Sequence, residues 1–251
     1  MNTVEVTCPS GLRGVLREMK VKEEQLFTNR KLARAGKTLT ALLDSCWLET
    51  QEAGPYTMTD GKPDWSNALS SDRTHLLIQL RIASVGDSYD FRTTCAGCRQ
   101  HFNWTVKLNE LDVKPVSPEG IQHVKTGEPL VISLPGGNQV KCRLLRGADE
   151  EFLSTSIKDE SKTLSYHLAR RIVEWNGKTH WREVLMAVED MSSREADSLW
   201  DALDDIEGGV DTMFDIECPH CYRLQQMILP FEAGFFSNRK RFSLSPVSED
   251  G

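Results

Sequence analysis

The 251-residue sequence contains no long apolar run and no export signal. Its apolar stretches all fall short of the roughly 18 residues that a membrane-spanning helix needs. The first ten residues, MNTVEVTCPS, lack the basic and apolar regions of a secretory signal peptide. We therefore expect a protein that is made in the cytoplasm and has no membrane partner.

A net positive charge is also absent. The formal net charge is −7, which argues against a nucleic-acid binder that depends on phosphate contacts. The charge is uneven, because residues 1–115 carry +1 and residues 116–251 carry −8. A solvated acidic surface is the simplest explanation, and the alternative is that two faces of an assembly select their partners by charge.

The common enzymatic motifs are missing as well. The sequence contains no GxxxxGK[ST] phosphate loop, no GxGxxG after a strand, no HExxH and no GxSxG. Its carboxylates are numerous but scattered, and many fall at expected helix starts, where capping explains them. No side chain stands out as a nucleophile with a base beside it, so the sequence predicts a protein that is not an enzyme.

What the sequence does contain is two CxxC pairs, each between two stretches that alternate apolar and polar residues. Such stretches are typical of β-hairpins. Thiolates two residues apart can face one metal ion when the chain turns tightly, and two such pairs supply the four sulfurs of a tetrahedral zinc site. We predict one structural zinc ion that joins distant parts of the chain, with the ligands Cys95, Cys98, Cys218 and Cys221.

Three alternatives to this zinc site remain open: a site completed by a second chain, a redox-active dithiol, and cysteine pairs without metal. A redox pair of the thioredoxin type usually begins a helix, whereas these pairs lie between strands. His101 and His220 could each replace a sulfur, but four cysteines already complete the set. Cys8, Cys46 and Cys142 have no partner at ligand spacing, and Cys46 is expected in the core.

The two halves of the sequence resemble each other in the same order of segments. A turn sequence, a strand with an arginine, an acidic helix start, two further helical segments and a CxxC hairpin follow one another in both. The offset between matching segments drifts between 116 and 126 residues. The segments that match are Thr7–Gly11 with Ser133–Gly137, Arg17 with Arg143, Glu23–Phe27 with Asp149–Leu153, Gly61–Trp65 with Gly177–Trp181, and Ser70–Ser71 with Ser192–Ser193.

The patterns predict an α+β protein built from two tandem units, each with a β-hairpin, about three helices and a CxxC-tipped hairpin. The expected hairpins are 3–8 with 13–18, 129–134 with 139–145, 88–94 with 101–108, and 212–217 with 223–230. The expected helices are 21–34, 37–49, 71–84, 148–158, 162–174 and 192–206. Serines are expected to cap the third helix of each unit.

These elements divide the chain into four regions. The first unit is predicted to occupy residues 1–115 and the second residues 129–236. The segment 116–128, which contains one proline and two glycines, is predicted to be a linker. The polar residues 237–251 are predicted to form a flexible tail.

With the repeat in view, the sequence resembles the T4-type bacteriophage baseplate protein family. The resemblance covers nearly the whole chain and is clearer in the second half. It departs from the usual pattern at Ser10–Gly14 and at Tyr222, where a glycine would be typical. The motifs that carry it are LPGG at 134–137, RLLRGADE at 143–150, GGVDT at 208–212, CPHC at 218–221, LPFE at 229–232 and GFF at 234–236, with GDS at 86–88 and CAGC at 95–98 in the first half.

The resemblance implies a non-enzymatic component of a phage tail baseplate or hub, or an assembly factor for it, found in the virion and made in the host cytoplasm. Its partners would be other tail, baseplate or hub proteins. Phe231, Phe235 and Phe236 form an apolar cluster that either contacts such a partner or folds back onto the core. The main alternative is a zinc-ribbon module that binds nucleic acid or the transcription machinery.

Overall fold

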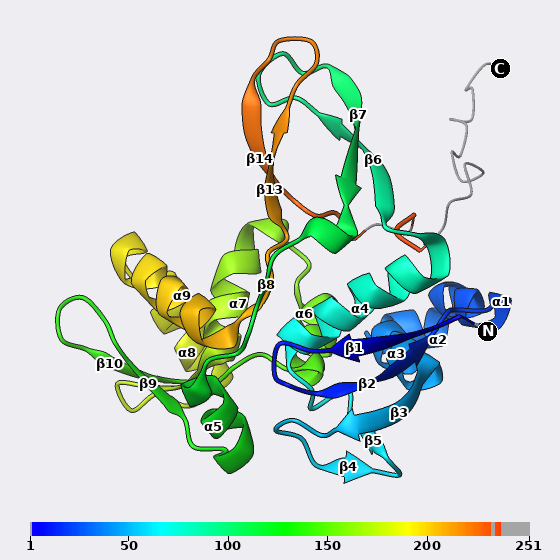
Figure 1. Ribbon diagram of the computed structural model, residues 1–251. Helices are drawn as coiled ribbons and strands as arrows, with labels where there is room; N and C mark the ends of the chain where they lie inside the picture. The colour runs from blue at the N-terminus through cyan, green and yellow to red at the C-terminus, as the bar shows by residue number, and fades with distance from the viewer. Residues whose placement is uncertain (1, 232–233, 237–251) are drawn as a thin grey trace.

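Two small antiparallel sheets, the helices beside them and two projecting hairpins make up the α+β fold (Figure 1). The computed structural model describes residues 2–231 and 234–236, so the predicted tail at 237–251 lies outside the described residues. Among the described residues, no helix is long and apolar enough to cross a membrane.

The first sheet has the strand order β1-β2-β3, in which the predicted hairpin of β1 and β2 gains a third strand. The helical segments lie between β2 and β3 and then beyond the short β4–β5 ribbon. The elements of this half are β1 (Thr3–Thr7), β2 (Arg13–Arg17), α1 (Val21–Glu24), a 3-10 turn (Gln25–Thr28), α2 (Arg30–Arg34), α3 (Thr38–Cys46), β3 (Trp47–Glu52), β4 (Met58–Thr59), β5 (Lys62–Pro63), α4 (Ser70–Val85), β6 (Ser88–Thr94) and β7 (His101–Lys107).

The second sheet has the order β9-β10-β11 and again consists of a hairpin with a third strand beside its second strand. A short ribbon of β8 and β12 joins the two halves. The elements here are a 3-10 turn (Leu108–Glu110), β8 (Val113–Lys114), α5 (Pro118–Thr126), β9 (Leu130–Ser133), β10 (Gln139–Cys142), α6 (Gly147–Ser156), a 3-10 turn (Glu160–Lys162), α7 (Thr163–Arg171), β11 (Ile172–Trp175), α8 (Trp181–Glu189), α9 (Ser193–Glu207), β12 (Gly209–Val210), β13 (Met213–Glu217) and β14 (Leu224–Ile228).

One predicted helix, 21–34, is broken in the structure. It divides into α1, a 3-10 turn and α2, because Asn29 adopts an extended backbone and its side chain accepts hydrogen bonds from the backbone N–H groups of Lys31 and Leu32. A short polar side chain that caps a new helix competes with continuation of the old one. The prediction of a single helix over this segment was therefore wrong.

Two predicted helices, 37–49 and 162–174, end earlier than expected. Trp47 begins β3, and Ile172 and Val173 belong to β11, so none of these residues is on a helix. Aromatic and β-branched side chains favour strands, and the free edge of the hairpin beside them offers backbone partners. Each sheet gains its third strand by this change.

The segment between the halves and one later segment also contain unpredicted helices. Within 116–128, predicted as a linker, α5 begins at Pro118 with Ser117 as its N-cap and packs near α9. The prediction has no element over 181–189, where α8 forms with Val184 and Val188 buried. The serine caps differ too: Ser192 caps α9, whereas α4 begins after Leu69, and the N–H of Ser70 donates to the carbonyl of Leu145.

The two halves are joined by contacts that do not involve the cysteines. Arg73 of α4 is 1% exposed and its Nε lies 2.8 Å from Oε2 of Glu150 in α6. The Nη1 of Arg73 donates to the carbonyl of Trp65 and to Oγ1 of Thr40. In addition, the backbone N–H of Gly147 donates to the carbonyl of Ala68. A buried cation therefore ties the two helices together in the body below the hairpins.

A buried carboxylate at the start of α1 predicts how stability depends on pH. Burial opposes ionisation of Glu23, but hydrogen bonds from Arg17, Ser45 and the N–H of Lys20 lower its pKa to about 2. An unfolded glutamate has a pKa of about 4.3. Because the folded pKa is lower, the ionised carboxylate stabilises the fold above about pH 5, and this contribution is lost as pH falls towards 2.

We therefore expect Glu23→Gln to be less stable than the natural protein at neutral pH, with a difference that shrinks as pH falls from about 5 to about 2. Urea unfolding at several pH values measures it. Acid release of a metal would affect both proteins alike, so the difference isolates Glu23. A difference that stays constant over this range would show that the carboxylate charge contributes nothing.

Candidate metal centre

Each CxxC pair lies at the tip of a hairpin, and the two tips have the same backbone hydrogen bonds. The N–H of Cys95 donates to the carbonyl of Gln100 at 2.9 Å, and the N–H of Arg99 donates to the carbonyl of Cys95 at 3.0 Å. At the other tip, Cys218 pairs in the same way with Arg223 at 3.0 Å and with Tyr222 at 2.9 Å. Both turns therefore present their two sulfurs to the same side.

The residue after each pair adopts a left-handed backbone. Arg99 has φ of 59° and Tyr222 has φ of 57°. This conformation favours glycine, because a Cβ atom crowds the neighbouring carbonyl. The position of Tyr222, where the family resemblance favours a glycine, therefore does have the backbone conformation that glycine adopts most easily. Tyr222 is 75% exposed, so its side chain has room and the strain is confined to the backbone of the turn.

The structure brings the four predicted ligands together from two hairpins more than a hundred residues apart in sequence, whose tips lie side by side (Figure 1). All four sulfur atoms lie within 4.8 Å of one another. The Sγ atoms of Cys95 and Cys221 are 3.6 Å apart, and those of Cys98 and Cys218 are 3.7 Å apart. The first cysteine of each pair therefore faces the second cysteine of the other.

These distances fit a metal with four thiolate ligands. Zn–S bonds of about 2.3 Å at tetrahedral angles place neighbouring sulfurs about 3.8 Å apart. Disulfide sulfurs are bonded at about 2.05 Å, and all four cysteines are free. A zinc ion closed by four thiolates keeps no open position for water or substrate, so the chemistry that it supplies when bound is structural.

Backbone N–H groups support a thiolate at the buried end of the cluster. The N–H groups of Gly97 and Cys98 point at Sγ of Cys95, at 3.3 and 3.5 Å. The hydrogen bond from Cys98 and then that from Gly97 lower the pKa of Cys95 to about 6. Cys95 and Cys218 are completely buried, whereas Cys98 and Cys221 reach the surface.

Side chains of the second hairpin hold the tip of the first. Oε1 of Gln225 accepts from the N–H of Ala96 at 2.9 Å, and its Nε2 donates to the carbonyl of Thr94. The side chain of Arg223 packs against Gly97. A Cβ atom added to Gly97 would lie only 2.7 Å from Cδ of Arg223. Below the cysteines, an apolar cluster fills the space between the hairpins: Phe102 and Ile216, with Trp104, Phe214 and Met227 packed against them.

The other residues that the sequence singled out lie elsewhere. Nδ1 of His101 lies 2.9 Å from Oγ1 of Thr94. Among the described residues, the group of side chains that could bind a metal ion consists of the four cysteines. It includes neither His101 nor His220. Cys8, Cys46 and Cys142 are buried, and Cys46 lies in the apolar core of the first half, as its helical position predicted.

The three phenylalanines near the C-terminus have different environments. Phe235 is buried against the ring of Tyr89, 5.0 Å away between centroids. Phe236 is half-buried and stacks on Phe27. Phe231 is 47% exposed. The alternative that these rings fold back onto the core therefore describes Phe235, whereas Phe231 remains accessible.

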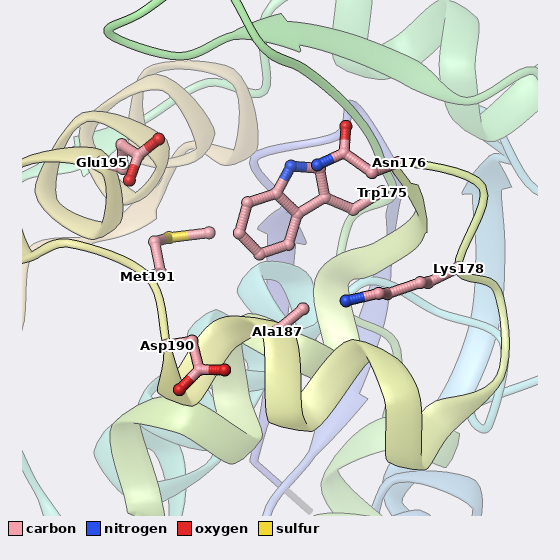
Figure 2. Close-up of a pocket in the computed structure, with 7 residues that line it drawn as sticks. All are labelled: Trp175, Asn176, Lys178, Ala187, Asp190, Met191 and Glu195. Atoms are coloured by element: carbon pink, nitrogen blue, oxygen red, sulfur yellow. The ribbon is translucent and has the colours of Figure 1, made fainter.

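A concave region near β11 and α8, of about 240 Å³, has no arrangement that suggests catalysis (Figure 2). The carboxylates of Asp190 and Glu195 and the amine of Lys178 lie on separate walls, with Met191 between the two acids. Glu195 is already engaged in capping α9. The residues that line this concave region include no nucleophile paired with a base.

Comparison with known proteins places this chain in one family. Residues 1–236 match the family described as T4 bacteriophage base plate protein. No curated protein and no solved structure matches the chain significantly. The match covers nearly all of the sequence, so the chain belongs to the T4 baseplate protein family, and its role is that of a phage tail baseplate protein.

Proposed function

We propose that this protein is a non-enzymatic structural or assembly component of a contractile phage tail baseplate or hub, and that it acts as a zinc-stapled adaptor between other tail proteins. Family membership supports the baseplate role. The observation that carries the zinc-stapled form is the convergence of four cysteine sulfurs from segments more than a hundred residues apart in sequence. In the proposal, Cys95, Cys98, Cys218 and Cys221 hold the ion.

The proposal includes a tandem duplication, with the two hairpins donated by equivalent units. The order of elements supports it, because each half has a sheet, helices and then a long helix that leads into a CxxC hairpin. Arg17 binds Glu23 at the start of α1, and Arg143 binds Asp149 at the start of α6, with the same spacing. The reciprocal pairing of sulfurs across the cluster fits a two-fold relation of the hairpins.

A rigid adaptor needs its two hairpins fixed relative to its helical body. The buried Arg73 and the β8–β12 ribbon join the halves below the hairpins. Phe235, in the segment after β14, adds a further contact, since its ring lies against Tyr89 in β6. A metal at the tips would fix the far end of the hairpins, which these contacts do not reach.

The exposed Phe231 offers a test of the adaptor role. Phe231, Phe235 and Phe236 are proposed as the partner-binding segment, but only Phe231 can be changed without opening the core. We expect Phe231→Ser to reduce incorporation into tails, because loss of an aromatic anchor at an interface costs about 2 kcal/mol or more. Quantitative mass spectrometry of purified tails measures the number of copies per particle.

The matched control is Met186→Ser, which is 65% exposed on α8, a helix that lies well apart from the segment after β14 (Figure 1). We expect it to be incorporated like the natural chain. Equal incorporation of Phe231→Ser would refute the contact at this residue. Absence of the natural chain from tails and from tail-assembly intermediates would refute the proposed function as a whole.

A further inference from the structure

The two hairpins pack face to face, so each turns one face inwards and one outwards. The inner faces are apolar and meet through contacts such as Phe91 with Phe214, whose ring centroids are 6.2 Å apart. Because side chains alternate along a strand, the outer face of each hairpin comprises every second residue. The two outer faces differ in chemistry, although the hairpins have the same position in the two halves of the chain.

The outer face of β6–β7 is polar, and several of its side chains pair with one another. Oγ1 of Thr105 donates to Oδ1 of Asp90 at 2.7 Å, and Nζ of Lys107 lies 3.3 Å from Oδ1 of Asp87. The exposed residues of this face include Asp90, Arg92, His101, Asn103, Thr105 and Lys107. Such a face is satisfied in water.

The outer face of β13–β14 is apolar at both ends. Met213 pairs with Ile228 at the base, and they are 51% and 65% exposed. Leu224, near the tip, is 67% exposed, and Tyr222 beyond it is 75% exposed. Single exposed apolar residues are ordinary, but here they form two groups, one at the base and one near the tip of the same hairpin, and exposed apolar groups of this kind are typical of an interaction surface.

Two carboxylates lie between these apolar ends. Asp215 and Glu217 are exposed on the same face of β13, opposite Gln226 and Leu224. Within the part of the chain that the structure describes, neither carboxylate forms an ion pair or a side-chain hydrogen bond. A complementary partner would therefore present apolar side chains together with cations.

We propose that this outer face, defined by Met213, Asp215, Glu217, Leu224 and Ile228 and called here the acidic hairpin face, is a docking surface for a cationic amphipathic segment of another tail protein. The inference rests on the proposed adaptor function and identifies one of its contact surfaces. Charge complementarity selects this partner, because Lys or Arg side chains would meet the two free carboxylates while apolar side chains cover the hairpin ends.

A second copy of this chain fits the acidic hairpin face poorly. Two such faces in a symmetric dimer would place Asp215 and Glu217 against the same residues of the copy, which like charges disfavour. In an asymmetric dimer, the acidic hairpin face of one copy would instead meet the outer face of β6–β7 in the other copy. That face would supply cations, but it would cover the exposed Leu224 and Ile228 with polar groups. The segment that docks is therefore expected to come from a different protein.

The test measures binding of a short fluorescent peptide that alternates leucine and lysine to the full-length, zinc-loaded protein by fluorescence anisotropy. We expect binding at low salt that weakens as salt increases. Asp215→Lys with Glu217→Lys should weaken it about tenfold or more, and so should Leu224→Ser with Ile228→Ser. A peptide that alternates serine and lysine has the same charge and should bind much more weakly.

The matched control is Glu119→Lys with Glu128→Lys, which changes the net charge equally at exposed residues around α5, remote from the hairpins. It should leave binding nearly unchanged. Equal weakening by this control, or no peptide binding at all, would overturn the proposal. A dimer in sedimentation that Leu224→Ser with Ile228→Ser dissolves would identify a second copy as the occupant and would also overturn it.

Tail incorporation separates this proposal from the proposed function. If the natural chain enters tails and the Leu224→Ser with Ile228→Ser variant enters equally well, the acidic hairpin face is refuted and the adaptor role stands. If the natural chain does not associate with tail proteins, the adaptor role itself fails. Unchanged zinc content of each variant shows that the hairpin tips are intact.

Discussion

Substitution of Cys95 or Cys218 by serine is expected to abolish zinc binding and to separate the tips of the two hairpins. Each of these residues is completely buried and its sulfur lies within 4.8 Å of the other three, so its loss leaves three ligands around an open position. Structural zinc contributes apparent binding free energies of about 10–16 kcal/mol in small domains. No single change outside the four-cysteine cluster should cost as much.

The location of the damage is a sharper expectation than its size. The halves are also joined by Arg73 and by the β8–β12 ribbon, which the cysteine substitution does not touch. Amide hydrogen exchange should therefore accelerate over β6–β7 and β13–β14, while α4 keeps its protection. Treatment of the natural protein with a chelator should give the same pattern.

Cys142→Ala is the matched control for this experiment. Cys142 is equally buried but lies in the core of the second half, away from the four-cysteine cluster. Loss of its sulfur should cost on the order of 1 kcal/mol as a small cavity and should leave the zinc content unchanged. Full zinc content in Cys95→Ser, or unaltered exchange in its hairpins, would contradict the account.

The second large effect is expected from Asp149→Ala, with a loss of about 3–5 kcal/mol in the free energy of unfolding. The carboxylate of Asp149 is 2% exposed and accepts from Arg143 and Arg170, each at 2.6 Å. It also accepts from the N–H of Arg146 at the start of α6. Its removal leaves two guanidinium groups and a helix N-terminus without their shared partner.

Urea unfolding of the zinc-loaded proteins measures this effect, with Asp201→Ala as the control. Asp201 is exposed on α9, and its substitution should change stability by no more than about 0.5 kcal/mol. A decrease of less than about 1 kcal/mol in the free energy of unfolding of Asp149→Ala would contradict this. It would mean that the ion pairs of Asp149 only offset the free energy of burying its charge. The zinc content should stay complete in both variants.

Local patterns in the sequence predicted the hairpins well and picked out the four cysteines that the structure brings together. The CxxC pairs and the alternating stretches around them placed β6, β7, β13 and β14 within two residues of their ends. The proposed ligand set rests on spacing alone, because a tetrahedral site with four thiolate ligands needs the four sulfurs that two such pairs supply. The structure then brings those four residues together.

Elements that depend on distant partners were missed. β3 and β11 continue directly from helices, and only the free edge of the adjoining hairpin makes them strands. The two-residue strands β8 and β12 are too short to leave a pattern. α8 could have been found, since Trp181, Val184, Leu185 and Val188 recur at helical spacing.

The sequence does not reveal which face of each hairpin is outermost, because all four strands alternate in the same way between more buried and more exposed residues. Met213, Leu224 and Ile228 read as ordinary strand residues until the inner face is known. Once Phe214 and Ile216 are placed inwards, the remaining side chains of β13 define the exposed face. Knowledge of the packing, rather than of the strand, was needed.

X-ray absorption at the zinc edge, with metal stoichiometry on the purified full-length chain, tests the central claim most directly. The account predicts one zinc ion per chain with four sulfur neighbours at about 2.3 Å. A folded protein without metal, or a zinc ion with nitrogen or oxygen among its ligands, would contradict it.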